Sequence, residues 1–149
     1  MDFNRLHPSC AIITCSQKHG RVEYCFECSG YPCKRYSCSG EKDSFISYRS
    51  VLSDSAKAKN DGVDSYMTEL REKVAILEFL LKTYNDGRRK SYYCTAVNLL
   101  PLSDLREIMT EIKEKTAARD FSQKETIEEI IRLFESHAKS KNIELKLRK

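Results

Sequence analysis

The sequence contains no tryptophan and has few of the residues that form turns. Only five glycines and three prolines occur in 149 residues. Glycine and proline supply the special backbone angles of tight turns, so their scarcity argues against a protein built from many hairpins. The composition favours long elements joined by few turns.

Long apolar stretches are also missing. No run reaches the roughly 18 consecutive apolar residues that a membrane-spanning helix needs. The N-terminus, MDFNRLHPSC, has neither the apolar segment nor the cleavage pattern of a signal peptide. We therefore expect a cytoplasmic protein that makes no contact with a membrane and keeps its thiols reduced. The net charge of +4 permits an acidic partner without demanding one.

Cysteine is abundant, and it is concentrated at one end. Six of the seven cysteines lie between residues 10 and 38. The remaining one, Cys94, sits in an apolar stretch and is expected to pack in a helical core. We therefore divide the chain into a cysteine-rich metal-binding module, residues 1–40, and a helical region, residues 41–149, that together form one compact unit.

The helical region predicts one helix after another. Between residues 63 and 84, apolar residues recur at steps of four and three, so one face stays apolar for about six turns. This segment is predicted to be the central helix, and Asn85-Asp86-Gly87 is predicted to stop it. Four further helices are expected to begin at Asp43, Ser91, Ser103 and the capping-box pattern Ser122-Gln-Lys-Glu125.

The tail NIELKLRK alternates apolar and polar residues, which predicts a short C-terminal strand. The expected fold class is therefore mostly α. It is a helical bundle with an N-terminal, loop-rich cysteine module that resembles a zinc knuckle, together with that strand.

The cysteines between residues 10 and 38 follow the spacing C-x4-C-x9-C-x2-C-x4-C-x4-C. At its centre, Cys25 and Cys28 form a CxxC pair, whose two-residue gap lets both sulfurs face one ion. Zinc takes four ligands tetrahedrally, so a second pair must come from nearby. The predicted metal ligands are Cys10, Cys15, Cys25, Cys28 and Cys33.

Five cysteines are one more than a single tetrahedral site needs, so we expect one zinc ion per chain. Cys25, Cys28, Cys33 and one of the two earlier cysteines would hold it. An iron–sulfur cluster is the alternative, because four thiolates suit it equally well. His7 and His19 lie close enough to replace a cysteine ligand, and Cys38 is interpreted as a spare thiol.

The run SCAIITCSQKHGRVEYCFECSGYPCKRY resembles the prokaryotic cysteine-rich "domain of unknown function 3795" family, which is described as zinc-binding. The family pattern of C-x4-C, a charged stretch with glycine, C-x2-C and an aromatic-Pro-Cys falls here on the five predicted ligands, with Tyr31-Pro32 before the last. NDGRRKSYYCTAVNLLPLSDLREIM is similar to a second signature of some members. Many members carry further cysteines upstream that this chain lacks, so the resemblance implies a metal but neither its full ligand set nor a task.

A basic segment, NDGRRKSYY, allows two interpretations. Arg88, Arg89 and Lys90 could bind phosphate, with Tyr92 or Tyr93 stacking on a base. Alternatively the cations follow a helix C-terminus, where the helix dipole favours them, and the tyrosines belong to the core. We favour the second interpretation.

The sequence predicts no catalytic residues, since the three histidines form no recognisable pairing with a nucleophile. The leading hypothesis is a zinc-binding protein that acts as a binding or adaptor module for a protein partner, with a structural metal. A nucleic-acid-binding protein that uses Arg88–Lys90 is one alternative. A metal- or thiol-dependent enzyme is the other, and we favour a protein that is not an enzyme.

Overall fold

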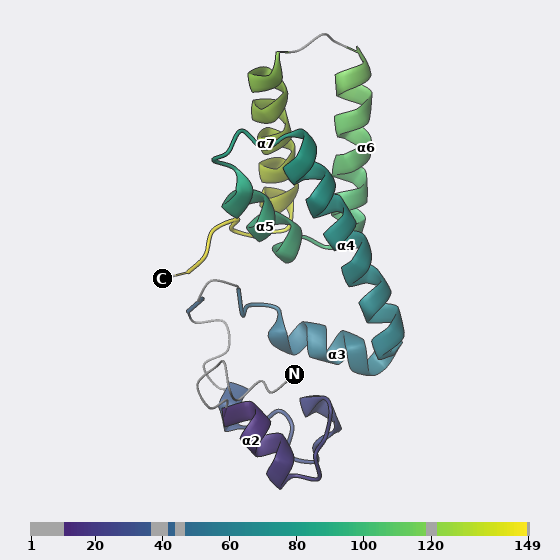
Figure 1. The fold of residues 1–149 in the computed structure, drawn as a ribbon, viewed down its shortest axis with the longest axis vertical. Coiled ribbons are helices and arrows are strands. Elements are labelled where there is room, and N and C mark those ends of the chain that lie inside the picture. Colours follow the sequence, from purple (N-terminus) through teal and green to yellow (C-terminus); the bar gives the residue numbers. More distant parts are fainter. Residues whose placement is uncertain (1–10, 37–41, 44–46, 119–121, 149) are drawn as a thin grey trace. The chain divides into compact units, whose positions relative to one another are not determined.

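The computed structural model describes residues 11–36, 42–43, 47–118 and 122–148. Within these ranges the chain is mostly helical and contains no strand, which confirms the mostly α prediction. It forms two compact units, Met1–Ser39 and Gly40–Lys149 (Figure 1). No helix in the described ranges is both long and apolar enough to cross a membrane.

The N-terminal unit contains one helix and two short 3₁₀ turns. Helix α2 spans Ala11–Lys18, and the turns η1 and η2 span Cys25–Glu27 and Lys34–Tyr36. We expected loops here, and the helix is an addition to that prediction. Gly20 follows the helix end in a left-handed conformation, and its φ of 85° suits a residue without a Cβ. No residue between 11 and 36 is buried.

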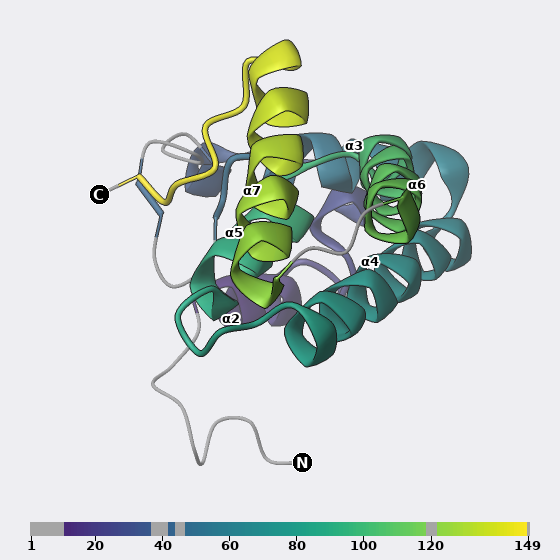
Figure 2. The same ribbon diagram turned by 90° about the horizontal axis from the view of Figure 1, so that it is seen from above.

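The second unit is a helical bundle. Helix α4 contacts α3, α5 and α6, and α6 and α7 contact each other and run antiparallel (Figures 1 and 2). Short connections favour this antiparallel packing of successive helices. The helices are α3 (Val51–Asp61), α4 (Val63–Thr83), α5 (Lys90–Leu99), α6 (Leu102–Ala118) and α7 (Gln123–Ser140).

The core of this unit lies where α4, α5, α6 and α7 meet. Tyr93 and Phe134 are its largest fully buried side chains, and their rings lie 6.2 Å apart. The Tyr93 hydroxyl donates to the carbonyl of Tyr84 at 3.2 Å, so the polar end of the ring is satisfied inside the core. The other large, fully buried side chains are Leu80, Leu100, Leu105, Ile108, Ile112 and Ile130.

Helix α4 has the predicted bounds but not the predicted burial. Leu80 is its only buried residue, whereas Val74 is 52% and Met67 is 40% exposed. The C-terminal half of α4 packs on α5 and α6, and its N-terminal half extends to α3 (Figure 1). The periodicity identified the apolar face correctly, but it did not show how much of that face other elements cover.

Three predicted helix starts differ from the structure. The first helix of this unit begins at Val51, eight residues after Asp43, and α5 begins at Lys90, one residue before Ser91. Helix α6 begins at Leu102, before Ser103. Ser103 lies inside the first turn, where its hydroxyl donates to Asp104. By contrast, the Ser122–Glu125 capping box is confirmed, with the hydroxyl of Ser122 accepting from the Glu125 backbone.

The C-terminal tail does not form the predicted strand. Helix α7 ends in a Schellman motif, in which Asn142 is left-handed with a φ of 54° and Ile143 N–H donates to the carbonyl of Ala138 at 2.8 Å. This motif turns Ile143 and Leu145 onto the helical core. Their alternation therefore reflects packing against helices instead of pairing with another strand.

Asp43 and Arg49 hold the tail in place. The Asp43 carboxylate is fully buried, and it accepts hydrogen bonds from the Arg148 backbone at 2.8 Å and the Tyr48 backbone at 3.0 Å. Arg49 pairs with Asp43 at 3.3 Å and donates to the carbonyls of Glu144 and Lys146. Asp43 therefore binds the tail and its own loop, and this use of its oxygens replaces the expected role as a helix cap.

Candidate metal centre

Three of the predicted ligands each open a tight turn. The carbonyl of Cys25 accepts from the N–H of Cys28 at 3.1 Å, and that of Cys28 accepts from Tyr31 at 3.0 Å. The carbonyl of Cys33 in turn accepts from Tyr36 at 2.9 Å. A hydrogen bond between residues three apart closes a tight turn, which reverses the chain within a few residues. The three turns therefore bring the three cysteine side chains toward one place.

Cys15 lies on α2, one turn before the helix ends. Its sulfur lies 3.5 Å from Nδ1 of His19, one helical turn later. The same Nδ1 lies 2.8 Å from the carbonyl oxygen of Cys15. A carbonyl only accepts, so Nδ1 donates, and in the neutral ring of His19 the lone pair then lies on Nε2.

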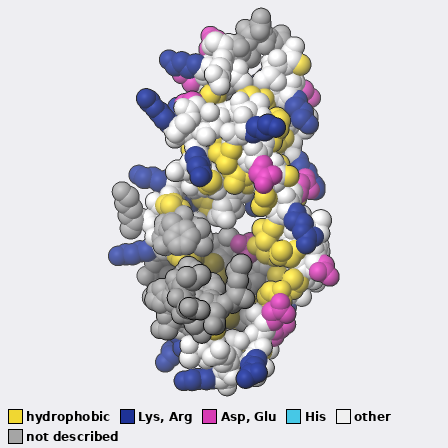
Figure 3. Space-filling view, in the orientation of Figure 1, with side chains coloured by type: hydrophobic (Ala, Val, Ile, Leu, Met, Phe, Trp, Pro, Cys, Tyr) yellow, Lys and Arg dark blue, Asp and Glu magenta, His cyan; other side chains and the backbone are white. Residues whose placement is uncertain are grey.

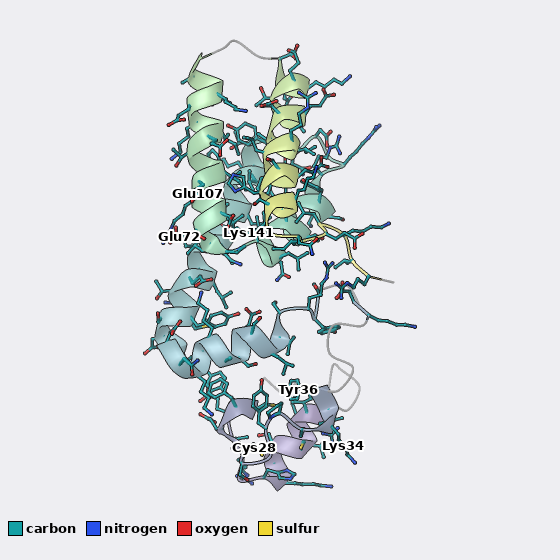
Figure 4. The ribbon with its side chains drawn as sticks, turned by 180° about the vertical axis from the view of Figure 1, so that it is seen from behind. Cys28, Lys34, Tyr36, Glu72, Glu107 and Lys141 are labelled. Carbon is teal, nitrogen blue, oxygen red and sulfur yellow. The ribbon has the colours of Figure 1, made fainter. Side chains whose placement is uncertain are left out.

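One pocket of about 100 Å³ collects the four described ligands. Cys15, Cys25, Cys28 and Cys33 all line it, together with His19 and two tyrosines, Tyr31 and Tyr36. Figure 4 labels Cys28 and Tyr36 in this unit. The described cysteines are free thiols, so the side chains are chemically able to bind a metal.

The spacing of these thiols is wider than in a closed zinc site. Zinc–sulfur bonds of about 2.3 Å place tetrahedral sulfurs roughly 3.8 Å apart. Within the described ranges, no three of the cysteine and histidine ligand atoms in this pocket lie within 4.8 Å of one another. The donor set fits zinc in type and number, and the thiols would have to approach one another to hold it.

Two tyrosine hydroxyls lie among the thiols. The Tyr31 hydroxyl is buried and has no hydrogen-bond partner. Burial raises the pKa of Tyr36, and the hydrogen bond to Cys25 raises it further. The two rings meet edge to face, with centroids 5.1 Å apart. A buried hydroxyl without an acceptor carries a desolvation cost, so this pocket favours an acceptor atom near Tyr31.

The remaining sulfur and histidine predictions fall elsewhere. Cys10, Cys38 and His7 lie outside the described residues. Cys94 is half-buried on α5, in the helical unit, and is distant in sequence from the predicted ligands. Tyr36 was missed, although its position three residues after Cys33 at the close of a turn could have drawn attention to it.

In the basic segment NDGRRKSYY, two side chains accept hydrogen bonds from the backbone of their own loop. The carboxamide oxygen of Asn85 accepts from the Gly87 backbone, and the carboxylate of Asp86 accepts from the Arg88 backbone. Arg89 lies 3.7 Å from Asp86. The loop conformation is thus explained by local hydrogen bonds.

The tyrosines after this segment are not available to stack on a base. Tyr93 is fully buried, which confirms the core interpretation, and Tyr92 packs against the same core with its hydroxyl 3.4 Å from the carbonyl of Ile131. Arg88, Arg89 and Lys124 line a pocket of about 300 Å³, but Asp86 and Glu128 line it too. On the face in Figure 3, cationic side chains are spread among acidic ones.

A second cluster of ligand-type residues joins α6 to α7. Oxygens of Asp104 and Glu107 and a ring nitrogen of His137 lie within 4.8 Å of one another. Nδ1 of His137 is 3.4 Å from Asp104, and Nε2 is 3.2 Å from Glu111. Lys141 lies 3.8 Å from the same Asp104 oxygen.

Charges within this cluster favour an ion-pair clasp over a metal site. Burial alone would lower the pKa of His137, but the hydrogen bonds to Glu111 and Asp104 outweigh it and raise the pKa above the ordinary 6.5. A protonated ring donates from both nitrogens and leaves no lone pair for a metal. Asp104 lies in the first turn of α6 and His137 in the last turn of α7, where each charge complements its helix dipole.

No protein-family model, no curated protein and no solved structure matches the chain. The resemblance to the "domain of unknown function 3795" family therefore stays a prediction from the cysteine pattern.

Proposed function

We propose that the N-terminal unit binds one zinc ion as a structural metal and that the chain acts as a binding or adaptor module. The single observation that carries this proposal is the shared pocket of Cys15, Cys25, Cys28 and Cys33. Residues spread over 19 positions of sequence contribute four thiols to one small volume. The free lone pair on Nε2 of His19 makes this histidine the alternative to Cys15.

Zinc would supply a cross-link between α2 and the turns that follow it. Structural zinc contributes folding free energy directly, roughly 10–16 kcal/mol apparent in finger peptides. The N-terminal unit needs such a contribution because none of its residues between 11 and 36 is buried. The spacing of the thiols suggests that this unit tightens when the metal binds.

The adaptor part of the proposal draws on the helical unit. A groove of about 460 Å³ runs between α4 and α6, and Ile76, Phe79 and Met109 give it an apolar lining. Glu72 and Arg106 form a two-pronged ion pair at the groove, with both distances 2.6 Å (Figure 4 labels Glu72). An apolar groove flanked by charge is typical of surfaces that bind protein segments.

The alternatives have less support. A nucleic-acid-binding role keeps its cations but loses its stacking tyrosines, because Tyr93 is buried. A thiol-dependent enzyme would need a base beside a nucleophilic cysteine. Nδ1 of His19 lies 3.5 Å from the Cys15 sulfur, but it donates to the Cys15 carbonyl, so it cannot accept the thiol proton in this geometry.

Elemental analysis and native mass spectrometry of protein purified without added metal test the proposal. We expect one zinc per chain in the parent protein and in Cys94→Ser, the matched control from the helical unit. Cys25→Ser and Cys28→Ser should each lose it. Absence of metal, or two tightly held equivalents, would contradict the proposal, and strong visible absorption with bound iron would favour the iron–sulfur alternative.

His19→Ala and Cys15→Ser separate the two candidates for the fourth ligand. The variant that removes the true ligand should weaken zinc binding strongly, while the other should bind like the parent. Competition against a chromophoric chelator measures both affinities. Equal, parent-like affinities in both variants would assign the fourth position to Cys10.

A further inference from the structure

Helix α4 carries an apolar repeat that its own unit covers only in part. Apolar residues recur at steps of four and three from Val63 to Tyr84, which places them at the a and d positions of a heptad repeat. An a and d repeat sustained over three heptads, with charges beside it, is the pattern of a helix that pairs with another helix in a coiled coil. The repeat therefore predicts a helical partner along this side of α4.

The contacts of α4 within the helical unit lie on its other side. Glu69 pairs with α3, Glu72 pairs with α6, and Lys73 donates to backbone carbonyls at the end of α5. At 3.6 residues per turn, these three residues share one side of the helix, and Met67 and Val74 lie on the opposite side. Val74 is 52% and Met67 is 40% exposed, so the helical unit leaves this part of the repeat uncovered.

Two opposite charges border the uncovered residues Met67, Leu70 and Val74, which we call the α4 stripe. Arg71 and Glu78 are both exposed, and they stand seven residues, or two helical turns, apart, so they share one edge of the stripe. In a two-fold symmetric pair, both copies present the same surface, so each residue meets a different residue of the other copy. An antiparallel second copy would place Arg71 of each helix opposite Glu78 of the other, which makes this edge complementary to itself.

The same register brings the apolar residues of the two helices together. It would set Val74 beside Leu77 of the second copy and Leu70 beside its Leu81, which are pairings of an a position with a d position. Leu77 and Leu81 are half-buried on the core of their own unit, so each keeps surface to offer. In a parallel pair, equivalent residues lie at the same height, so the opposite charges would not face each other. Charge and apolar pattern thus favour the antiparallel arrangement together.

We propose that the α4 stripe is a dimer interface, along which α4 of a second copy of this chain packs antiparallel with Arg71 of each copy opposite Glu78 of the other. This inference goes beyond zinc binding and does not depend on it. The groove between α4 and α6 lies on a different side of α4, at Ile76 and Phe79, so it stays open in the dimer. The interface is a single pair of helices, so the dimer is expected to be weak and to dissociate at micromolar concentrations.

Sedimentation equilibrium of the full chain tests the interface, over a concentration range of about 1–500 μM. We expect a monomer–dimer equilibrium in the parent. Val74→Lys should weaken association about 100-fold, because it places a charge in the apolar contact. Ser65→Lys, at an exposed position on the opposite side of α4, is the matched control and should associate like the parent. Unfolding of dilute, monomeric protein should be nearly unchanged in both variants, since neither side chain lies in the core.

Charge reversal tests the antiparallel register. Arg71→Glu and Glu78→Arg each place like charges opposite each other at two symmetric points, so each single variant should weaken the dimer about 10-fold. The double variant Arg71→Glu with Glu78→Arg restores both opposite-charge pairs, and its affinity should return to within about threefold of the parent. Damage to the fold of the monomer would not be repaired by combining the two substitutions, so this rescue is specific to the contact between copies.

Three results would overturn the proposal. A parent that stays monomeric over the whole concentration range has no such dimer, and protection of Met67 in hydroxyl-radical footprinting of that monomer would show that the N-terminal unit covers the stripe instead. A dimer that Val74→Lys does not weaken forms through another face. A dimer that Val74→Lys weakens but the double charge reversal does not restore has a different register. Zinc content measured in the same samples tests the proposed function separately, because the stripe contains no metal ligand.

Discussion

Residues 11–36 and the helical unit differ in how they can be stabilised. The first stretch has one short helix, two 3₁₀ turns and no buried residue, while the second buries side chains as large as Tyr93 and Phe134 completely. Units of about 40 residues or fewer seldom bury enough apolar surface to fold without a cross-link or a metal. Under the proposed function the first unit would depend on metal ligation, whereas the second depends on packing.

Metal removal should separate the two units most clearly. A strong chelator is expected to unfold the N-terminal unit, since structural zinc contributes roughly 10–16 kcal/mol apparent in finger peptides. Helical circular dichroism from α3 to α7 should change little. Hydrogen exchange measured peptide by peptide checks both halves at once. Loss of protection throughout the helical unit would show that the two units fold as one.

Truncation of a core side chain should destabilise the helical unit and leave the N-terminal unit unchanged. Phe134 is fully buried between α5 and α7, so Phe134→Ala is expected to lower the free energy of unfolding of the helical unit by about 3–5 kcal/mol. Zinc content should not change. Val74→Ala, on the exposed side of α4, is the control and should shift stability by about 0.5 kcal/mol or less. Loss of zinc in Phe134→Ala would contradict independent stabilisation.

The ion pair of Asp43 with Arg49 and its hydrogen bonds from the tail, together called the Asp43 clasp, should make the stability of the helical unit sensitive to acid. Burial alone would raise the pKa of Asp43, but hydrogen bonds from Arg148, Tyr48 and Ser47 and the charge of Arg49 lower it to about 2, below the ordinary 3.8. Its contribution is therefore complete above pH 3.8 and is lost as the pH falls toward 2.

Asp43→Ala is expected to cost about 3 kcal/mol at neutral pH, because it leaves Arg49 and the tail without their acceptor. Denaturant unfolding at pH 7 and at pH 3 measures both effects. Asp43→Asn is the control that keeps the shape and part of the hydrogen bonding. An unfolding free energy with the same acid dependence in parent and Asp43→Ala would refute the clasp.

The ion pairs of His137 with Asp104 and Glu111, called the His137 clasp, should stabilise the helical unit at low pH and not at high pH. Their effect should be weaker than that of the Asp43 clasp. The raised pKa of His137 means that its ion pairs with Asp104 and Glu111 are complete below pH 6.5 and are lost as the pH rises through the folded value. We expect a loss of about 1 kcal/mol, since Glu111 is partly exposed. His137→Gln should remove this pH dependence. Stability that increases from pH 6 to 9 in the parent would contradict the assignment.

Removing the basic segment should have the smallest effect. Arg88→Ala with Arg89→Ala is expected to change stability by about 0.5 kcal/mol or less, since both side chains are at least partly exposed. We also expect weak or absent retention of the parent on RNA or DNA at physiological salt. A tight, salt-sensitive complex that the double variant loses would favour the nucleic-acid alternative, with the salt slope lower by about 0.7–0.9 per lost contact.

Local patterns in the sequence predicted what depends on neighbours along the chain. The capping box at Ser122, the helix from Val63 and the apolar faces of α6 and α7 all follow from contacts within about four residues. The cysteine spacing likewise identified the ligand candidates, because short gaps limit how far apart their side chains can lie.

Tertiary structure decided which apolar side chains are buried and which polar groups form contacts with one another. The repeat of α4 did not reveal that Val74 is exposed, and the alternation of the tail did not reveal that it packs on helices. The residues next to Asp43 in sequence predict that it caps a helix. Its partners are Arg49 and Arg148 instead, and Arg148 lies 105 residues away in the sequence. Burial and pairing of this kind depend on segments distant in sequence, which no local pattern encodes.

The sequence by itself thus determined a helical protein with a cluster of metal-type ligands at one end, since helix periodicity and cysteine spacing are local properties. Only the tertiary structure decided that Cys15 shares a pocket with the CxxC pair and that the hydroxyls of Tyr31 and Tyr36 lie among the thiols. The turns between residues 19 and 36 bring these groups together, and their meeting depends on the path of the folded chain through space.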